Sequence, residues 1–282
     1  MSGERRGPEQ EAAGAAAASP TRRAVTLGAL ALAAAGLTQA PRVWRDWSAG
    51  EFDFTPLSRP EGFRLLSAGS VTAGRGAGAA LQVLPPNDPV ARRVDAAQEA
   101  AQEAARVDLC GTLFGAGRVP EGVTPVASFS DYNCPYCRIL TKVLAGMEAE
   151  SGGAVQVRWH EWPLFGEVSE VYARAAIAAD RQGAYPQMHA RLMRTRFVPN
   201  DQYLIRVAEE GGLNPARLLA DLSAPETEAR IAEARALAAM FGFPGTPALV
   251  VGRTAVIGAI PEAALAKLIE RERVEGPPPG CA

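Results

Sequence analysis

The chain has 282 residues, enough for one sizeable domain or two small ones, and its composition is that of a globular protein. It carries 29 basic and 31 acidic residues, and the formal charge of −2 gives no reason to expect nucleic acid or an anionic membrane surface as a partner. Four cysteines are too few for a disulfide scaffold, and with two histidines a metal site built on imidazole is nearly excluded. The fold must therefore rest on an apolar core.

Residues 1–40 have the layout of an export signal. The paired arginines Arg22 and Arg23 precede an uncharged apolar run that ends at Leu37, and the small residues up to Ala40 suit a signal peptidase. Paired arginines behind a long N-terminal region resemble the twin-arginine type. An uncleaved N-terminal anchor is the alternative, but an apolar run of about 14 to 17 residues is short for a span that needs about 20. In both cases the cysteines are expected outside the cytoplasm, in the periplasm, where a disulfide persists.

Two segments precede the catalytic domain. Residues 41–87 mix aromatic residues with Gly, Ser and Pro, which predicts an irregular arm with one or two short strands that packs on the main domain. Residues 88–118 are predicted to form an amphipathic, Ala-rich helix that begins with Asp88 as N-cap and Pro89 in its first turn, and ends near Cys110. Its packing face is predicted to consist of Val90, Val94, Ala97, Ala101, Ala104 and Leu109.

A short strand, a turn and two cysteines at the start of a helix form the central motif. Val126 to Phe129 is a compact apolar run, and apolar residues recur at helical spacing from Leu140 onward. A CxxC pair, here Cys134 and Cys137, can close a disulfide within one helical turn. Unpaired N–H groups at the helix N-terminus stabilise a thiolate on the first cysteine and lower its pKa. The motif therefore predicts thiol–disulfide exchange.

The spacing also assigns roles within this motif. Cys134 is predicted to attack and to form the mixed disulfide, because it is nearer the helix N-terminus and nearer solvent, and Cys137 is predicted to resolve that disulfide. Pro135 needs no N–H partner and fixes φ for a helix start. Tyr136 is expected to cover the sulfurs and tune their reduction potential. A permanent structural disulfide or half of a zinc site are the alternatives, although a zinc site would want a second CxxC or a Cys/His pair.

A strand and a series of helices follow. Val155, Val157 and Trp159 alternate with polar residues, which predicts a strand with one buried face. The resulting strand–helix–strand unit demands a right-handed crossover and a parallel pair of strands. Residues 168–241 are predicted to be almost wholly helical. The predicted helix starts are a Ser169 cap, an Asn200 cap, Asn214-Pro215 and Pro225.

Strand character returns near the C-terminus. Residues 247–251 and 254–257 are predicted to form a hairpin through Gly252-Arg253. A final helix is expected to start at Pro261. Residues 273–282 form the tail, and its stretch from Gly276 to Ala282 is too rich in Pro and Gly for regular structure.

This order of elements resembles the DsbA-like family of exported thiol–disulfide oxidoreductases. The matching stretches are Phe129–Cys137, Glu161–Gly166 and Gly245–Pro247, and the resemblance covers about residues 119–272. It implies an α/β thioredoxin fold with a helical insertion, about residues 168–242, between the second and third core strands.

The resemblance also implies a substrate-facing wall beside the sulfurs. In thioredoxin-like proteins a cis-proline faces the cysteine pair, and Pro247, preceded by Thr246, matches it. The free backbone of Thr246 is then expected to pair with an extended substrate segment by strand addition. Some family members bury an acidic residue beneath the cysteines where this chain has Ser128. Asp131 or Glu161 could relay protons to Cys137 instead, or could be surface or capping residues.

The remaining cysteines and the histidines have less specific roles. Cys110 and Cys281 could form a structural disulfide, could remain unpaired, or could pair between molecules through Cys281. His160 and His189 are expected to be ordinary surface or half-buried residues.

The function predicted from these features is an exported oxidase that introduces disulfides into reduced proteins. It would need no bound cofactor and no metal, and a membrane redox partner would reoxidise it; membrane contact by the chain itself is expected only if residues 1–40 stay attached. The nearest alternative is a disulfide reductase or isomerase that uses the same dithiol. A more distant one is a copper carrier, which would want extra Met or His ligands near the pair.

Overall fold

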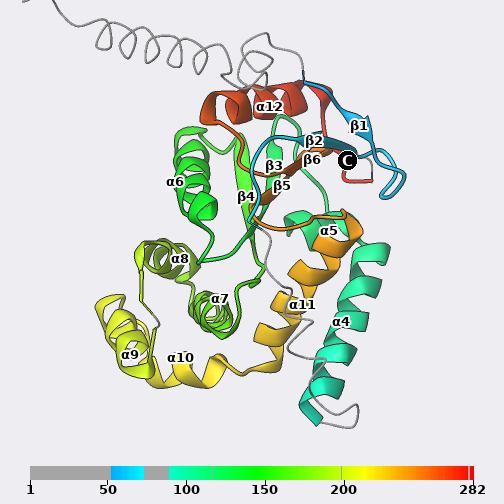
Figure 1. Ribbon diagram of the computed structural model, residues 1–282. Coiled ribbons are helices and arrows are strands. Elements are labelled where there is room, and N and C mark those ends of the chain that lie inside the picture. The colour runs from blue at the N-terminus through cyan, green and yellow to red at the C-terminus, as the bar shows by residue number, and fades with distance from the viewer. Residues whose placement is uncertain (1–51, 73–88, 116, 198, 279) are drawn as a thin grey trace, which may run out of the picture. The chain divides into compact units, whose positions relative to one another are not determined.

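A six-stranded mixed sheet organises the described part of the chain (Figure 1). The structure is a computed structural model that describes residues 52–72, 89–115, 117–197, 199–278 and 280–282. The chain divides into two units, Met1–Phe52 and Asp53–Ala282, and the second contains every element described below. The predicted export signal and the predicted Asp88 cap lie outside the described residues.

The strand order is β1-β2-β6-β5-β3-β4. Strands β3 and β4 are parallel, as are β2 and β6, and the other neighbours are antiparallel. The bounds are Thr55–Pro56 for β1, Arg64–Ser67 for β2, Thr124–Ser130 for β3, Val155–Glu161 for β4, Ala248–Val251 for β5 and Thr254–Ile257 for β6. The predicted strand–helix–strand unit and the hairpin at Gly252-Arg253 are therefore confirmed.

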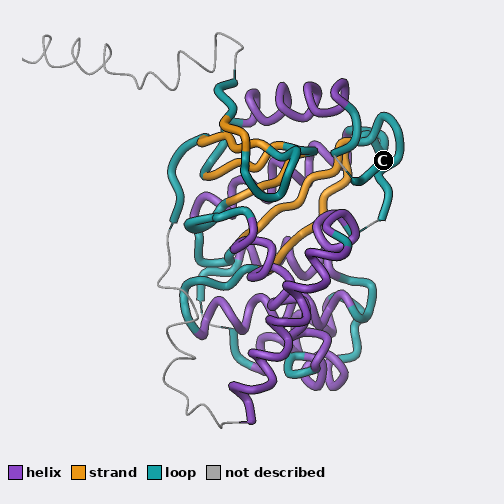
Figure 2. The backbone as a smooth tube through the Cα atoms, turned by 90° about the vertical axis from the view of Figure 1, so that its right-hand side faces the viewer, coloured by secondary structure: helices purple, strands orange, loops and turns teal. Residues whose placement is uncertain are grey.

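Nine helices are present among the described residues. They are α4 (Pro89–Val107), α5 (Leu109–Phe114), α6 (Pro135–Glu150), α7 (Glu167–Asp180), α8 (Tyr185–Arg194), α9 (Asp201–Glu210), α10 (Pro215–Asp221), α11 (Pro225–Met240) and α12 (Glu262–Glu275). Helices α7 to α11 follow β4 and precede β5, so they occupy the position of the predicted helical insertion. Figure 2 shows the strands gathered in the upper part of the unit and most of these helices below them. In the part of the chain that the structure describes, no helix is long and apolar enough to cross a membrane.

Strand β3 lies at the centre of the core and carries the site at its carboxyl end. All seven of its residues are buried, because β4 and β5 flank it and helices pack against it. Phe129 stacks on the His160 ring at 4.7 Å between centroids and meets the Phe243 ring edge-on at 5.3 Å. Burying a side chain of this size stabilises the fold by about 1.5–3 kcal/mol. The buried packing of Phe129 therefore fixes the position of the end of β3, from which the turn to Cys134 begins.

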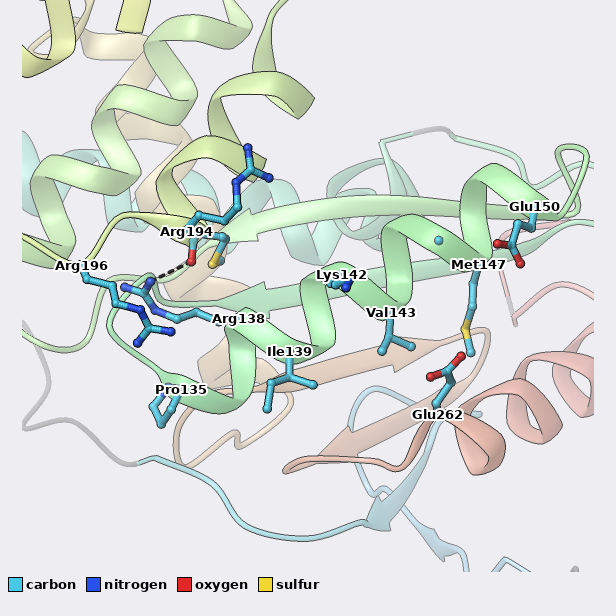
Figure 3. Close-up of a pocket in the computed structure, with 12 residues that line it drawn as sticks. Pro135, Arg138, Ile139, Lys142, Val143, Met147, Glu150, Arg194, Arg196 and Glu262 are labelled. Atoms are coloured by element: carbon cyan, nitrogen blue, oxygen red, sulfur yellow. Dashed lines mark hydrogen bonds between the residues drawn. The ribbon is translucent and has the colours of Figure 1, made fainter.

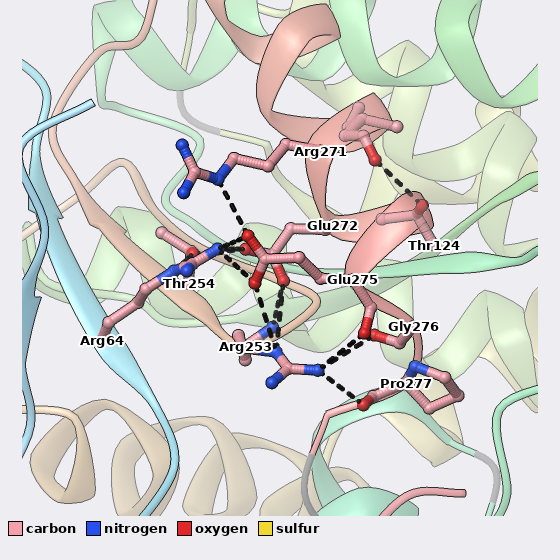
Figure 4. A network of polar contacts seen from close by, with 10 residues as sticks. Arg64, Thr124, Arg253, Thr254, Arg271, Glu272, Glu275, Gly276 and Pro277 are labelled. Carbon is pink, nitrogen blue, oxygen red and sulfur yellow. Dashed lines mark hydrogen bonds and ion pairs between the residues drawn. The ribbon is translucent and has the colours of Figure 1, made fainter. Parts of the chain in front are cut away.

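The N-terminal arm contains two short strands, β1 and β2, as predicted. It differs from the prediction in how it joins the domain: β2 pairs in parallel with β6 and extends the sheet itself. Figure 4 shows the polar contacts that fix this pairing. The Arg64 guanidinium contacts Glu272 Oε1 at 2.5 Å and donates to Thr254 Oγ1 at 2.8 Å, and Glu272 also accepts from the Arg253 amide at 2.8 Å. The Glu272 carboxylate thus joins β2, the β5–β6 turn and α12.

The predicted helix of residues 88–118 is interrupted. Helix α4 ends at Val107, and Asp108 caps a separate helix, α5, by accepting from the Gly111 amide at 2.8 Å. Ala104, predicted to pack, is exposed, and Ala105 is buried in its place. An aspartate competes for backbone N–H groups and so favours a new helix start over continuation.

Helix starts in the insertion follow the predictions except at α7. Asn200 accepts from the Tyr203 amide at 2.9 Å and Asn214 from the Arg217 amide at 3.0 Å, as N-caps do. Ser169 was expected to cap α7, but that helix starts at Glu167, and the Ser169 hydroxyl donates instead to Asp131 at 2.8 Å. Ser169 lies inside the first turn of α7, where its hydroxyl serves as a donor to the buried Asp131 carboxylate.

Candidate active site

Cys134 is the N-cap residue of α6. Its sulfur accepts a hydrogen bond from the Cys137 amide at 3.3 Å, and Pro135 occupies the first helical position, where no N–H is required. The helix therefore directs unpaired N–H groups and the positive end of its dipole at the Cys134 sulfur. Both cysteines are free thiols in the structure.

The second wall of the site is the loop before β5. The Thr246–Pro247 peptide bond is cis, and the Cys134 thiol donates to the Thr246 carbonyl oxygen at 3.6 Å. Pro247 offers no backbone N–H at this point. The CxxC motif follows β3 and the cis-proline loop precedes β5. Because β3 and β5 are neighbours in the sheet, the two segments lie side by side.

The two thiols differ strongly in acidity. The pKa of Cys134 is lowered from 9.0 to about 6, mainly by the hydrogen bond from the Cys137 thiol, with contributions from Thr246 and Thr72; burial acts in the opposite direction. Burial raises the pKa of Cys137 well above its ordinary value, and the adjacent Cys134 sulfur adds to this effect. The pair therefore holds one thiolate and one thiol at neutral pH.

Solvent exposure does not distinguish the two cysteines. Cys134 is 0% exposed and Cys137 is 1% exposed, so exposed area does not confirm the expectation that Cys134 lies nearer solvent. The reason is an N-terminal segment that was not predicted to reach the site. Acidity, rather than exposure, is what marks Cys134 as the more reactive sulfur.

That segment brings Thr72 to Cys134. The Thr72 Oγ1 atom lies 3.6 Å from the Cys134 sulfur. The Thr72 amide donates to the Thr246 carbonyl oxygen at 2.7 Å, and the Thr246 amide donates to the Thr72 carbonyl oxygen at 3.1 Å. The prediction that the Thr246 backbone is free is therefore wrong. Nothing in the sequence around Thr72 signals this contact.

Asp131 organises the turn before the cysteines. Its carboxylate accepts from the amides of Asn133 and Leu164, both at 2.6 Å, and from the Ser169 hydroxyl. Burial raises the Asp131 pKa, and these hydrogen bonds oppose that effect. Only its backbone contacts Cys137. Asp131 is therefore neither a surface residue nor a helix cap, because Cys134 is the N-cap of α6 and Gly166 that of α7. Its buried carboxylate ties the turn before α6 to Leu164 and to the first turn of α7.

Glu161 lies in a separate buried cluster. It accepts from Tyr132 at 2.6 Å and from Tyr185 at 2.5 Å, and its Oε1 lies 3.1 Å from His189 Nδ1. Among the described residues, neither the Asp131 nor the Glu161 carboxylate has a hydrogen bond to a cysteine sulfur. The structure therefore shows no direct contact through which Asp131 or Glu161 could pass a proton to Cys137.

Both histidines are buried, contrary to the expectation of surface or half-buried positions. His160 contacts the Leu113 carbonyl oxygen at 2.9 Å, and burial lowers its pKa to about 3. The alternation of β4 predicted an exposed face here, but α5 and α11 cover the end of that strand. In the described part of the chain, no group of three or more His, Cys, Asp or Glu residues could hold a metal ion.

Cys110 and Cys281 are bonded to each other, with their Cα atoms 5.5 Å apart. The bond joins α5 to the C-terminal tail, and the Val119 amide donates to the Cys281 carbonyl oxygen at 2.8 Å beside it. Both sulfurs are buried and lie outside the Cys134 site.

A groove of about 760 Å³ runs along α6 beside the site (Figure 3). Ile139, which is 67% exposed, lines the groove one helical turn along α6 from Pro135. Arg138, Arg194 and Arg196 cluster at the end near Pro135. Carboxylates lie toward the opposite end: Glu150 and Glu262. Tyr136, expected over the sulfurs, is 38% exposed.

An acidic helix-capping cysteine, a buried partner cysteine and a facing cis-proline loop, on a sheet with a helical insertion, define a thioredoxin-type dithiol oxidoreductase. The family model described as the DSBA-like thioredoxin domain matches residues 125–270, and the chain belongs to this family. It is accordingly an oxidoreductase of the thiol–disulfide type.

Solved structures are similar to this chain over more than half of its length. A thioredoxin-like oxidoreductase from Silicibacter pomeroyi DSS-3 is 38% identical with a TM-score of 0.53, over 58% of this chain and 98% of that one. A periplasmic thioredoxin-like protein from Salmonella enterica serovar Typhimurium is 25% identical with a TM-score of 0.50, over 58% and 95%. The thiol-disulfide exchange protein alpha-DsbA2 from Wolbachia pipientis, at 18% identity and a TM-score of 0.52 over 62% and 97%, shares the fold. No curated protein matches the chain.

Proposed function

We propose that this oxidoreductase acts as an exported oxidase that passes a disulfide from Cys134–Cys137 to reduced proteins. The observation that carries the proposal is the lowered pKa of Cys134, about 6, beside the raised pKa of Cys137. A sulfur of low pKa is a good leaving group, and a stabilised thiolate favours the reduced form of the enzyme. Both effects favour transfer of the disulfide from the enzyme to the substrate protein.

The proposed reaction has two exchange steps. A substrate thiolate attacks Cys134 in the oxidised enzyme, the Cys134–Cys137 bond breaks, and Cys137 leaves and takes up a proton. A second substrate thiolate then attacks the substrate sulfur of the mixed disulfide, and Cys134 leaves as a thiolate. Two electrons pass from the substrate to the enzyme, so the dithiol is itself the redox group and no bound cofactor is required.

Reoxidation and location belong to the same proposal. Each turnover leaves Cys134 and Cys137 reduced, so an oxidising partner must accept the two electrons; we place that partner in the membrane. The export signal predicted in residues 1–40 and the similarity to a periplasmic thioredoxin-like protein support a site outside the cytoplasm. The bridge between Cys110 and Cys281 is proposed as a structural disulfide suited to that compartment.

The groove along α6 is proposed to hold the substrate segment that flanks the reacting cysteine. Its basic end adjoins Pro135, and the exposed Arg194 and Arg196 side chains would complement acidic residues of that segment. The double variant Arg194→Glu/Arg196→Glu is expected to raise KM for a peptide with acidic flanking residues and to leave a neutral peptide unaffected. An equal change for both peptides would refute this placement.

The mixed-disulfide step is tested by trapping. The probe is an unfolded protein whose cysteines are all present as mixed disulfides with a small thiol. In Cys137→Ser, the Cys134 thiolate attacks the protein sulfur and displaces the small thiol, and the covalent complex is expected to accumulate because no resolving thiol remains. Cys134→Ser is the matched control and is expected to form none. Equal trapping by both variants would refute the assignment of Cys134.

A disulfide reductase or isomerase remains the alternative direction for the same dithiol. It predicts a higher Cys134 pKa in the working enzyme and a more reducing potential, so the reduction potential of the Cys134–Cys137 pair distinguishes the two directions.

A further inference from the structure

We propose that the segment Ala68–Thr72, here called the strap, occupies the backbone edge at which a substrate would pair, and must leave before Cys134 reacts with a polypeptide. The strap is an intramolecular stand-in for an extended substrate segment. The statement about substrates rests on the proposed function; the statement that the strap shields Cys134 does not.

The strap is seated by backbone hydrogen bonds along its length. It continues from β2, and the Ala68 amide donates to the Ile257 carbonyl oxygen at 2.8 Å. Further along, the Ala259 amide donates to the Ser70 carbonyl oxygen at 3.0 Å. It ends in the antiparallel bridge between Thr72 and Thr246. These bonds hold it as an irregular continuation of β2 that runs past the end of β6 to Thr246.

Two glycines allow this close approach. A Cβ atom at Gly69 would lie 2.6 Å from the Ala259 carbonyl oxygen. One at Gly258, whose φ is +93°, would lie 2.3 Å from the Gly69 carbonyl oxygen. Both distances are too short for any side chain, so the strap can lie here only because both residues are glycine.

The strap takes the two groups that strand addition requires. Antiparallel pairing of a substrate at Thr246 needs its amide and its carbonyl group, and both are bonded to Thr72. The Thr72 side chain also lies against the Cys134 sulfur, which has no exposed surface. A substrate thiolate cannot reach that sulfur while Thr72 is in place. Occupancy by the strap and by a substrate segment are therefore mutually exclusive.

The strap is held weakly enough to leave. Of its five residues only Ala68 is buried, and Gly69 and Ser70 are exposed. Segments with few buried apolar contacts open locally without global unfolding. Upstream, the contact between Arg64 and the buried Glu272 keeps β2 anchored, so that release is confined to the strap.

Displacement has a consequence for substrate class. An extended polypeptide can replace both hydrogen bonds of Thr72 with its own backbone, whereas a small thiol or alkylating reagent cannot. The strap therefore favours extended cysteine-containing segments over small thiols. Weakening the strap should help small reagents more than it helps peptides.

The test is the rate at which Cys134 is alkylated in the reduced full-length protein. All variants also carry Cys137→Ser, so that Cys134 is the reacting thiol of the pair. Each rate is divided by the fraction of Cys134 that is thiolate in the same variant. Thr72→Pro removes the amide that bonds to Thr246 and is expected to raise the rate with a bulky maleimide about tenfold, because the strap then opens more often. Thr72→Val keeps the backbone pairing and is the matched control, expected to change the normalised rate less than about twofold.

A second variant guards against misfolding at Thr72. Gly69→Ala pushes the strap from Ala259 and is expected to raise the rate in the same direction. In the unmodified protein, hydrogen exchange is expected to be faster at the Thr72 amide than at the Val250 amide of the central sheet. Unchanged alkylation in both Thr72→Pro and Gly69→Ala would overturn the proposal. Because alkylation requires no disulfide transfer, this result is independent of whether the protein is an oxidase.

Discussion

The Cys134 sulfur and the Thr246 carbonyl oxygen lie 3.6 Å apart, so the start of α6 and the loop before β5 are in direct contact. Sequence neighbours of both residues complete the site: Cys137 supplies an amide and a thiol to the Cys134 sulfur, and Pro247 follows Thr246 in a cis bond. The hydrogen bond from Cys137, with smaller contributions from Thr246 and Thr72, explains why the Cys134 thiol is acidic although it is buried. Hydrogen bonds, rather than water, stabilise its charge.

The pH dependence of Cys134 reactivity follows from this arrangement. In the reduced protein, the rate of reaction with iodoacetamide should follow a titration with a midpoint at about pH 6, because the pKa of Cys134 is lowered to that value. Cys137→Ala removes the hydrogen bond that contributes most and should move the midpoint upward. Mass spectrometry of the alkylated peptide identifies the reacting cysteine. An unchanged midpoint in Cys137→Ala would contradict the assigned cause.

Stability of the reduced protein should depend on pH through the same group. The folded-state pKa of Cys134, about 6, lies below the value of a free thiol, about 8.5, so the unfolded chain binds more protons between these values. The stabilisation is therefore complete above about pH 8.5 and disappears as pH falls through about 6. Urea unfolding of the reduced protein and of Cys134→Ser should show a difference in free energy of unfolding that shrinks from pH 8.5 to pH 5. A difference that stays constant or grows toward acid would contradict the lowered pKa.

The contact between β2 and α12 should be a main source of stability for the N-terminal strand. Glu272→Ala would leave Arg64 and the Arg253 amide without their carboxylate, whose side chain is fully buried. Removing one partner of a buried ion pair costs about 3–5 kcal/mol. Glu275→Ala removes a more exposed partner of the same arginine and should cost about 0–1 kcal/mol. Urea unfolding of the oxidised protein measures both, and equal small losses would refute the anchoring role of Glu272.

Much of the site could be predicted from local sequence. The apolar run before Cys134, the helical spacing after it and Pro135 at the first helical position are short-range signals, and they predict a cysteine at a helix N-terminus. The hairpin at Gly252-Arg253 is local in the same way, and Gly252 is required there because a Cβ would lie 2.4 Å from Glu272 Oε2. The conformation of the CxxC helix start and of the hairpin is determined by residues that are close in the sequence, and it can therefore be predicted from sequence.

The features that sequence reasoning missed depend on contacts between distant segments. Thr72 reaches Cys134 only because β2 adds to β6, and the sequence of β2 does not specify which edge it joins. His160 follows the alternation of an exposed face, yet α5 and α11 cover it. No local pattern reports which helices cover the end of a strand. The burial of Cys134 was missed for the same reason.

The reduction potential of the Cys134–Cys137 pair tests the central claim most directly. Equilibration of the protein with glutathione redox buffers at pH 7, followed by acid quenching and alkylation, gives the fraction reduced at each ratio. Because the Cys134 thiolate stabilises the reduced form, we expect a potential clearly more oxidising than that of thioredoxin, about −270 mV. A value at or below about −270 mV would contradict the proposed oxidase and favour a reductase.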